Sequence, residues 1–489
     1  MKLCKLIFDD ECKIKKEDKN LEITHIANSP DTLDQNGLFF IFSERALKNF
    51  TSKRVKNGVV ILDEKLDFVN KNLGRTSIYK CYDARRLLTL AHFRFANIDT
   101  ARMKFIGITG TNGKTSTALL TTEILKNAGY NVGFIGTGRI EYDGKSLCEC
   151  DYSMTTPDPW ILYPAIKQMQ SLGCEIIVME VSSHALALDK VTPITFDYGV
   201  FTNLSQEHLD FHTDIEDYYK TKKKLLSQSL TSVFNLDDYY SRRAYAEHTG
   251  NKIGVGILWK GDVWATGIQN NGFRGTEYMY RTHGYLFKMS LPIAGIHNIY
   301  NSMMATAVCT DIGVKPCVAK EALKSVSTLP GRFEIIKNDI TVIIDYAHTA
   351  FAFDNILKEI NSSKLPKEEL WVVFGCGGER DRSKRPKFAA SAEKYADKII
   401  VTADNSRSEN TLQIINDITA GFKENKYEII EDRRSAIESA ITHAEKGAVV
   451  AIIGKGAEKY NIDENGYHAF DEKKIILDAL KCRNEKIVL

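Results

Sequence analysis

The chain has 489 residues, more than one hydrophobic core usually organises, which predicts about three domains of roughly 150 residues each. Its 43% hydrophobic and 26% charged content is that of an ordinary globular chain, and no apolar run approaches the roughly 20 residues that cross a bilayer. The net charge is +2 and the basic residues are interspersed with acidic ones. We therefore expect neither nucleic-acid binding nor membrane insertion.

The ten cysteines contain no CxxC pair, since Cys148 and Cys150, the closest two, are separated by one residue. Neither a disulfide framework nor a zinc ribbon is indicated. The first residues reach Asp9 and Asp10 before an apolar segment typical of an export signal develops. We expect a cytoplasmic protein.

The first hundred residues hold short apolar segments at 37–42 and 59–62, which predict a small mixed α/β domain. From residue 104 the pattern becomes strand (105–109), Gly-rich turn, helix (116–128) and strand (131–135). This order is a βαβ unit and implies a parallel sheet with a right-handed crossover. Strands at 175–180 and 197–202 predict that this sheet is doubly wound.

The turn dipeptide Pro330-Gly331 predicts a domain junction. Beyond it, three apolar strands run directly into polar, Gly-rich or Asx-rich loops: 370–374, 398–402 and 449–453. Ligands bind at the carboxyl ends of strands in open α/β sheets, so these loops predict the site of a Rossmann-like last domain. The predicted domains are 1–100, 101–331 and 332–489.

A phosphate-binding loop, Gly110-Thr-Asn-Gly113-Lys114-Thr115, lies between the predicted strand and helix. Backbone N–H groups and the helix N-terminus stabilise phosphate charge there. Lys114 would reach the β and γ phosphates, and the Thr115 hydroxyl would bind Mg²⁺. The strict GxxxxGK[ST] pattern needs glycine at the position of Ile108, so a chance Gly-rich turn is the alternative. The loop alone would also suit a switch GTPase or a motor.

The variant GTNGKT resembles the phosphate loop of the Mur ligases and of their folylpolyglutamate synthetase relatives. Further segments resemble Mur ligase motifs in the same order: Met154-Thr-Thr-Pro157, Met179-Glu-Val-Ser-Ser-His184, Thr202-Asn-Leu-Ser-Gln-Glu-His208-Leu-Asp-Phe-His212, Leu329-Pro-Gly-Arg332-Phe-Glu334, Asp345-Tyr-Ala-His348-Thr349, Gly375-Cys-Gly-Gly378 and Gly454-Lys-Gly456. The resemblance implies a central P-loop-type ATPase domain between a uridine-binding first domain and an amino-acid-binding last domain. It implies an ATP-dependent acid–amino acid ligase of the EC 6.3.2 class that acts in peptidoglycan synthesis.

Such a ligase activates a carboxylate as an acyl phosphate, so its site must hold two anions together, helped by positive charge from Lys114 and Mg²⁺. The resemblance implies ATP contacts from Gly110, Thr111, Asn112, Gly113, Lys114, Thr115, Ser116, Asn298, Arg332, Asp345 and His348. Taken singly, Asn298, Arg332 and Asp345 would more often be a cap, a turn or a salt bridge.

The resemblance also implies a metal site, in which Thr115, Glu180 and His208 hold Mg²⁺ together with Lys222 as a carbamate (N6-carboxylysine). Lys114, Lys222 and His208 would then be the catalytic residues. Carbamylation needs a neutral amine, which burial and nearby positive charge favour by lowering the pKa. The alternatives are an exposed strand end for Glu180, a histidine satisfied by structural hydrogen bonds for His208, and a solvated helix face for the lysines at 220–224.

Contacts to a UDP-muramoyl dipeptide are implied for Ser29, Thr155, Thr156, Ser182 and Lys190. Hydroxyls suit this role because each can donate and accept, although strand-end turns are the alternative. Lys190 stands where the family has arginine, so the charge remains but the bidentate geometry is lost. The segment around Ser29 departs from the family's Asp-Ser-Arg pattern.

The last domain resembles members that add meso-diaminopimelate, through Asp404-Asn405-Ser406-Arg407 in place of Asp-Asn-Pro-Arg. The other implied amino-acid contacts are Arg380, Gly454 and Glu458. Arg407 offers a fork for the distal carboxylate and Glu458 can pair with the distal ammonium. Lysine would leave a buried arginine unpaired, which allows discrimination of about 10⁴.

Two departures leave lysine, ornithine or another diamino acid open: Ser406 replaces proline, and Ala457 replaces the family's usual histidine. Arg407 could also be a surface arginine at the start of a helix. The rival hypotheses are a folylpolyglutamate synthetase-like ligase, a specialised natural-product ligase, and a non-catalytic nucleotide-binding switch or partner protein. We expect a monomer.

Overall fold

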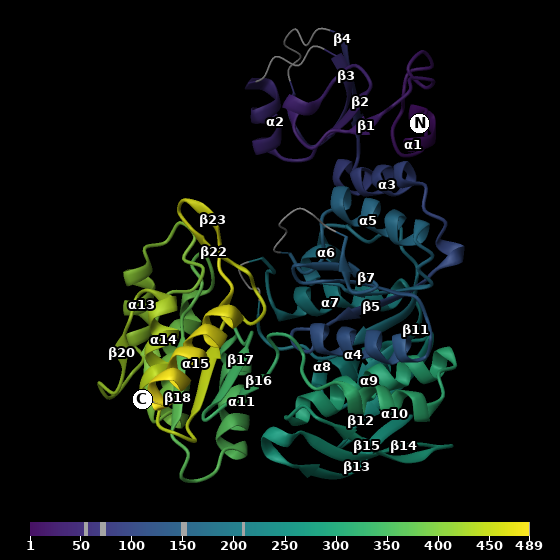
Figure 1. The fold of residues 1–489 in the computed structure, drawn as a ribbon. Coiled ribbons are helices and arrows are strands. Elements are labelled where there is room, and N and C mark those ends of the chain that lie inside the picture. The colour runs from purple at the N-terminus through teal and green to yellow at the C-terminus, as the bar shows by residue number, and fades with distance from the viewer. Residues whose placement is uncertain (53–56, 69–74, 148–153, 208–210, 489) are drawn as a thin grey trace.

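The computed structural model spans residues 1–489 and describes all of them except 53–56, 69–74, 148–153, 208–210 and 489. Three sheets of four, eleven and six strands follow one another along the chain, with a two-stranded hairpin after the third. Figure 1 shows the first at the top, the second at the lower right and the third at the lower left. None of the described helices combines the length and the apolar character that a membrane span requires.

The first domain is a four-stranded parallel sheet with strand order β1-β2-β3-β4 and helices on both faces. Its strands confirm the apolar segments expected at 37–42 and 59–62. Helix α3 packs on this sheet and on α5 of the next domain, so it joins the two. The elements are α1 (Leu3–Leu6), β1 (His25–Ile26), β2 (Gly37–Ile41), α2 (Glu44–Ser52), β3 (Asn57–Asp63), β4 (Arg75–Cys81) and α3 (Ala84–Ala96).

The central domain contains the strands and helices from residue 104 to residue 325. They are β5 (Lys104–Thr109), α4 (Lys114–Asn127), β6 (Val132–Gly136), β7 (Arg139–Tyr142), β8 (Lys145–Ser146), α5 (Pro159–Ser171), β9 (Ile176–Glu180), α6 (Ser183–Ala187), β10 (Phe196–Phe201), α7 (Ile215–Ser227), β11 (Ser229–Asn235), α8 (Tyr239–Glu247), β12 (Asn251–Gly256), β13 (Val263–Asn270), β14 (Thr276–Thr282), β15 (Leu286–Leu291), α9 (Ile296–Ile312) and α10 (Pro316–Ser325).

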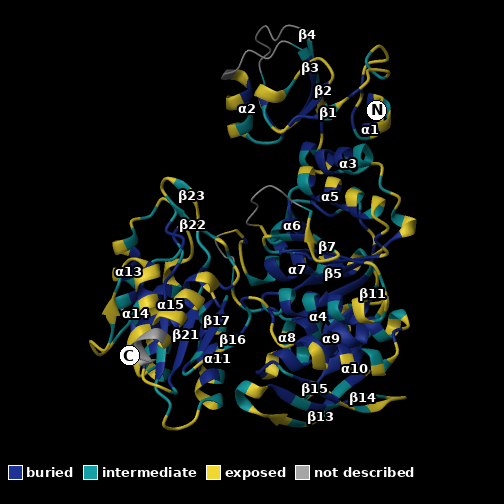
Figure 2. Ribbon diagram, in the orientation of Figure 1, coloured by how far each residue is buried: buried dark blue, intermediate teal, exposed yellow. Residues whose placement is uncertain are grey.

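The central sheet is doubly wound, as the βαβ pattern predicts. Its order is β15-β14-β13-β12-β11-β10-β5-β9-β6-β7-β8, and the strands from β12 to β6 are parallel. These strands are buried on both faces, by α4, α9 and α10 on one side and by α5 and α7 on the other (Figure 2). The chain first builds β9 and β6 on one side of β5 and then β10 and β11 on the other. The carboxyl end of β5 is therefore the topological switch point, where α/β proteins bind ligands.

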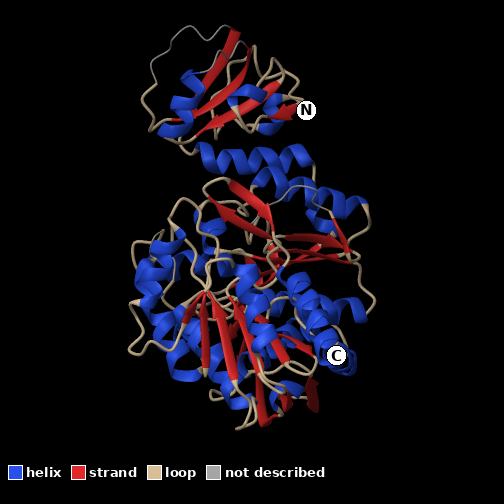
Figure 3. Cartoon of the chain, turned by 60° about the vertical axis from the view of Figure 1, so that its left-hand side comes forward, coloured by secondary structure: helices blue, strands red, loops and turns tan. Residues whose placement is uncertain are grey.

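The last domain is a six-stranded sheet of order β16-β17-β21-β18-β19-β20, parallel except for β16 (Figure 3). The carboxyl ends of β17, β18, β19 and β21 lie at one edge of this sheet. Its elements are β16 (Glu334–Lys337), β17 (Thr341–Asp345), α11 (Ala350–Ser363), β18 (Leu370–Phe374), α12 (Arg385–Tyr395), β19 (Lys398–Val401), α13 (Thr411–Thr419), β20 (Glu428–Ile429), α14 (Arg433–His443), β21 (Val449–Ile453), β22 (Tyr460–Asp463), β23 (Gly466–Ala469) and α15 (Glu472–Val488).

Candidate active site

The phosphate loop has the strand–turn–helix setting that the sequence predicts. Gly110 and Gly113 have φ angles of +146° and +84°, which L side chains rarely adopt. A Cβ at Gly110 would also collide with the Thr202 hydroxyl, so this position requires glycine. The left-handed Gly113 is the residue before α4. The helix begins at Lys114, two residues before the start at residue 116 that the sequence predicts. Its N-terminus points into the loop as a phosphate site demands.

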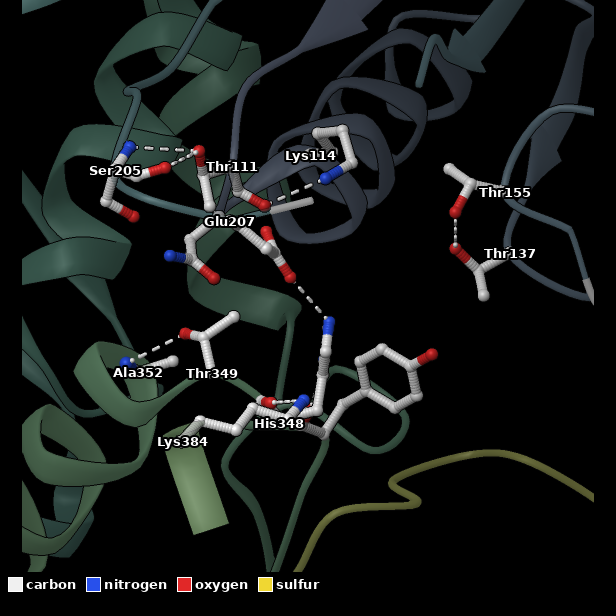
Figure 4. Close-up of polar contacts among 12 residues, drawn as sticks. Thr111, Lys114, Thr137, Thr155, Ser205, Glu207, His348, Thr349, Ala352 and Lys384 are labelled. Carbon is white, nitrogen blue, oxygen red and sulfur yellow. Dashed lines mark hydrogen bonds and ion pairs between the residues drawn. The ribbon is translucent and has the colours of Figure 1, made fainter. Parts of the chain in front are cut away.

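The loop is held by the segment that follows β10. The backbone N–H of Asn112 donates to Asn203 Oδ1 at 2.9 Å. The N–H of Ser205 donates to Thr111 Oγ1 at 3.0 Å (Figure 4). Ser116 is buried in the first turn of α4. The contacts of Asn112 and Thr111 hold the loop's shape.

Two lysines converge on this loop. Lys114 Nζ donates to the carbonyl oxygens of Gly110 and Thr111, each at 2.9 Å, and Lys222 Nζ donates to that of Gly110 at 2.9 Å. Lys222 is only 1% exposed, so the solvated-face alternative is wrong for this lysine, whereas Lys220 is exposed. Burial, reinforced by Lys114, puts the pKa of Lys222 well below its usual value. Desolvation likewise lowers the pKa of Lys114, opposed by the carboxylates of Glu207 and Glu180.

Glu180 ends β9 at the same sheet edge and is fully buried, so the exposed-strand-end alternative is wrong. Its Oε2 accepts from Thr115 Oγ1 at 2.8 Å, and its Oε1 accepts from the backbone N–H of Thr137 at 3.0 Å. The Thr137 hydroxyl in turn donates to Thr155 Oγ1 at 3.2 Å (Figure 4). Thr137 thus connects the Glu180 carboxylate to the predicted peptide site. Its position directly after strand β6 was the available sequence signal, and the sequence reasoning missed it.

A hydroxyl and a carboxylate suit Mg²⁺, which prefers oxygen ligands, and Thr115 and Glu180 bring such oxygens together beside the phosphate loop. In the described part of the chain, no group of three or more His, Cys, Asp or Glu side chains is placed to hold a metal ion. The prediction for His208 falls outside the described residues.

The predicted dipeptide contacts of the central domain lie next to Glu180. Thr156 Oγ1 donates to the Glu180 carbonyl at 2.9 Å and accepts from the N–H of Ser182 at 3.0 Å. Ser182 caps α6. Lys190, 8% exposed, forms an ion pair of 2.6 Å with Asp158. Ser29 stands apart from this group, since its hydrogen bonds stay within a turn of the first domain.

Residues at the start of the last domain reach the phosphate loop. Arg332 Nη2 donates to Thr115 Oγ1 at 3.0 Å, and its guanidinium lies 4.3 Å from the centre of the Tyr346 ring. His348 Nε2 lies 3.0 Å from Glu207 Oε1 (Figure 4). Both contacts join the central and last domains. The motifs quoted from the sequence contained Glu207 and Tyr346, but neither was assigned a role.

Asp345 and Asn298 both form hydrogen bonds with backbone groups, as would be expected if they served as a cap or stabilised a turn. Burial raises the pKa of Asp345, against the effect of Arg332, and its carboxylate accepts from the N–H groups of Phe333 and Ala347, each at 2.7 Å. Asn298 is buried near the start of α9, and its Nδ2 donates to the Ala294 carbonyl at 2.8 Å. Helix α9 packs on α4, the helix that begins at the phosphate loop.

The predicted amino-acid contacts gather at the carboxyl ends of β19 and β21. Asn405 Nδ2 donates to Glu458 Oε2 at 2.9 Å. Gly454 has φ +127°, and a Cβ there would lie 2.8 Å from Asp404 Oδ2, so glycine permits this close approach. Burial raises the pKa of Asp404, but Lys455 and Arg433 outweigh it and hold that pKa below its usual value.

Arg407 follows the buried Ser406 in a left-handed conformation, with φ +54°. Its Nη1 donates to the carbonyls of Gly378 at 2.7 Å and Asn405 at 3.2 Å. Helix α13 begins four residues later at Thr411, so the helix-start alternative is wrong. Arg380 is exposed and lies near Gly377, as Arg407 does. Its Nη1 contacts the Glu379 carbonyl at 3.4 Å.

Comparison with known proteins identifies the family. Residues 108–309 match the Mur ligase middle domain, and residues 331–456 match the Mur ligase, glutamate ligase domain. The chain is 37% identical over 488 residues, 98% of this chain and 99% of the relative, to "UDP-N-acetylmuramoyl-L-alanyl-D-glutamate--2,6-diaminopimelate ligase 1" of Clostridium acetobutylicum. It is 40% identical over 402 residues, 81% of this chain and 82% of the relative, to the diaminopimelate ligase of Aquifex aeolicus.

Solved structures show the same fold. A structure titled as a UDP-N-acetylmuramoyl-L-alanyl-D-glutamate--2,6-diaminopimelate ligase superposes with a TM-score of 0.67 at 24% identity and covers 99% of both chains. The Escherichia coli protein FolC, in complex with DHPP and ADP, superposes with a TM-score of 0.61 at 18% identity and covers 76% of this chain and 89% of that one. The near full-length relatives and the two matched domains show that this chain belongs to the Mur ligase family and is an ATP-dependent acid–amino acid ligase.

Proposed function

We propose that the chain adds meso-2,6-diaminopimelate to the D-glutamate of UDP-N-acetylmuramoyl-L-alanyl-D-glutamate, with ATP and Mg²⁺. The observation that carries the proposal is the set of charged groups at the ends of β19 and β21. There Arg407 supplies a guanidinium for a distal carboxylate, while Asp404 and Glu458 supply carboxylates for a distal ammonium. The names of the near full-length relatives support the same substrate. We place the domain boundaries after residues 100 and 331.

ATP binds at the switch point of the central sheet in this proposal. The N–H groups at the start of α4 receive the phosphates, and Lys114 leaves the carbonyls of Gly110 and Thr111 to contact the β and γ phosphates. Arg332, already at Thr115, adds positive charge from the last domain. These cations offset the repulsion between the γ-phosphate and the substrate carboxylate, which is the main electrostatic barrier to acyl phosphate formation.

Thr115 and Glu180 are the described residues that would hold Mg²⁺, together with His208 and a carbamate on Lys222. Bound there, Mg²⁺ would neutralise phosphate charge and orient the transferred group. The carbamate forms when the neutral Lys222 amine attacks carbon dioxide and loses a proton. The buried position of Lys222 beside Lys114 favours the neutral amine that this step requires.

The acyl phosphate is attacked by the amino group of the amino acid, and phosphate leaves with the P–O bond intact. The last domain orients that amine by holding the far end of the amino acid at Arg407 and Glu458. Orientation of this kind converts a reaction between two molecules into one between fixed neighbours. Thr155, Thr156, Ser182 and Lys190 would hold the muramoyl dipeptide at the edge that carries Glu180.

The proposal is tested by ADP formation from ATP, Mg²⁺ and UDP-muramoyl-alanyl-glutamate with meso-diaminopimelate, lysine, ornithine or no amino acid. We expect turnover that depends on both substrates, with the highest kcat/KM for diaminopimelate. Arg407→Ala should lower the ratio of kcat/KM for diaminopimelate over lysine by about 10- to 100-fold, since a charged hydrogen-bonded pair is lost. Turnover confined to a folate and glutamate would refute the cell-wall substrate.

A further inference from the structure

A buried lysine, Lys455, lies between the carboxylates of the amino-acid pocket. Its side chain is fully buried, and Nζ lies 3.5 Å from Glu458 Oε2 and 3.8 Å from Asp404 Oδ1. Its shortest contact is a hydrogen bond of 2.8 Å to Asn405 Oδ1. No part of the proposed chemistry described above uses this ammonium. A buried cation is costly unless it is paired, so its surroundings must compensate it.

The surroundings of Lys455 are the residues that would read the amino acid. Asn405 accepts from Lys455 and from the N–H of Ile462 with Oδ1, and donates to Glu458 with Nδ2. Lys455 and the Ile462 N–H together fix which way the Asn405 amide points. The amide orientation in turn makes Asn405 a donor to Glu458. Tyr346 OH donates to the other Glu458 oxygen at 3.1 Å, so this carboxylate has one defined position.

Lys455 also sets the charge of the pocket. Asp404 and Glu458 carry two negative charges and Lys455 carries one positive charge, so the three groups together present one net negative charge. The second nearby cation, Arg433, is matched by its own ion pair with the buried Glu472, at 2.7 Å. Arg407 supplies a separate positive charge and donates to the Asn405 backbone carbonyl, whereas Lys455 donates to the side-chain oxygen. One negative and one positive site is what a distal group with one ammonium and one carboxylate requires.

We propose that Lys455 is a specificity-determining positioning residue, which sets the charge and the geometry of Glu458 so that the pocket accepts one distal ammonium. The inference rests on the proposed function of this pocket. Lys455 acts through Asn405 and Glu458 and does not touch the reacting atoms. Without it, the Asp404 and Glu458 carboxylates would lose their shared counter-charge and would repel each other, and the Asn405 Oδ1 would keep only its hydrogen bond from the Ile462 N–H.

The test uses the full-length protein and three amino acids. These are meso-diaminopimelate, 2-aminopimelate, which lacks the distal ammonium, and lysine, which lacks the distal carboxylate. The variant is Lys455→Met, which keeps the length of the side chain, and the matched control is Lys459→Met on an exposed lysine four residues later. ADP formation gives kcat and KM for each substrate. Lys455→Gln replaces the first variant if Lys455→Met does not fold.

We expect Lys455→Met to raise the KM for diaminopimelate about tenfold and to lower the diaminopimelate/2-aminopimelate ratio of kcat/KM by a similar factor, as loss of one charged hydrogen bond predicts. The KM values for ATP and for the UDP-dipeptide should stay within about twofold of the wild type, as should all constants of Lys459→Met. In a Glu458→Gln background the Lys455 substitution should lower the ratio no further, because both act on one interaction.

A purely structural role makes a different prediction. If KM rises equally for the three amino acids and the ratio is unchanged, Lys455 does not determine specificity and the inference is wrong. If the wild type turns over none of the three, the proposed function itself fails. The two failures are therefore distinguished by the wild-type measurement.

Discussion

Three lysines of the site show how burial changes what one residue type can do. Lys114 contacts two carbonyls, which it would leave in the proposed mechanism to reach phosphate. Lys222 is buried against Gly110, and Lys455 is enclosed by two carboxylates and an amide. Their sequence settings do not separate them, because Lys222 belongs to a run of lysines and Lys455 is flanked by glycines. How far each lysine is removed from water depends on the face of the helix or the end of the strand that carries it.

Replacement of the single residue Lys222 tests the proposed metal site. Lys222→Ala should lower kcat by about 100-fold or more, because electrostatic stabilisation of the transferred phosphoryl group is lost. The nucleotide should still bind, since Lys114 and the loop N–H groups remain. Lys223→Ala is the control, because Lys223 pairs with Glu247 at the surface. Kinetics of ADP formation and calorimetric nucleotide titration measure the two effects, and near-normal turnover of Lys222→Ala would exclude the carbamate role.

A second prediction concerns the side-chain hydroxyl of Thr137. Thr137→Val removes the hydroxyl, which donates to Thr155 at 3.2 Å and lies 3.5 Å from Glu180 Oε2, but it keeps the side-chain shape and the N–H that holds Glu180. The loss of about 1 kcal/mol should raise the KM for the UDP-dipeptide about fivefold and leave the KM for ATP unchanged. Thr137→Ser, which retains the hydroxyl, is the control and should behave as the wild type. Equal KM values for Val and Ser variants would show that Thr137 does not position the acceptor.

At the level of elements, the apolar runs predicted the central strands closely. Strands β18 and β21 have the predicted bounds, β9 begins one residue later than predicted, and β10 is shifted by one residue toward the N-terminus. Parallel strands are buried on both faces, so they appear as continuous apolar runs. Strands β13, β14 and β15, which pair with one another in antiparallel fashion, contain buried residues that alternate with partly exposed ones, and the sequence reasoning missed them. Their register depends on partners rather than on composition.

Helix α3, which joins the first two domains, contains a pH-sensitive histidine. His92 is buried, its Nε2 has no hydrogen-bond partner among the described residues, and burial lowers its pKa to about 4. The unfolded chain has a histidine pKa of about 6.5, so it binds the proton more readily below that pH. The contribution of neutral His92 to stability is therefore complete above pH 6.5 and is lost as the pH falls toward 4.

The expected size of this effect is on the order of 1 kcal/mol at pH 5.5. The unfolding temperature of the wild type should fall more between pH 7.5 and pH 5.5 than that of His92→Gln. His443→Gln, at an exposed helix end, is the control and should keep the wild-type pH dependence. Thermal unfolding followed by circular dichroism measures the three proteins. Parallel curves for wild type and His92→Gln would contradict the assignment.

At the scale of the whole molecule, the site is assembled from segments far apart in the chain. Arg332 donates a hydrogen bond to Thr115, and His348 contacts Glu207, across the junction of the central and last domains. Motif order predicted which residues belong together, since strands of one sheet end at one edge. It could not predict Thr137 or Tyr346, whose importance lies in contacts between two motifs. It also could not place Ser29, which lies in a turn of the first domain, apart from the other predicted substrate contacts.

The most direct test of the account follows oxygen atoms. The substrate is UDP-muramoyl-alanyl-glutamate labelled with ¹⁸O in the carboxylate that becomes the amide, and the reaction contains ATP, Mg²⁺ and meso-diaminopimelate. If the carboxylate attacks the γ-phosphate to form an acyl phosphate, the released phosphate must carry one ¹⁸O atom for each tripeptide formed. Mass spectrometry of phosphate and product measures this ratio. Unlabelled phosphate alongside tripeptide formation, or no tripeptide at all, would contradict the account.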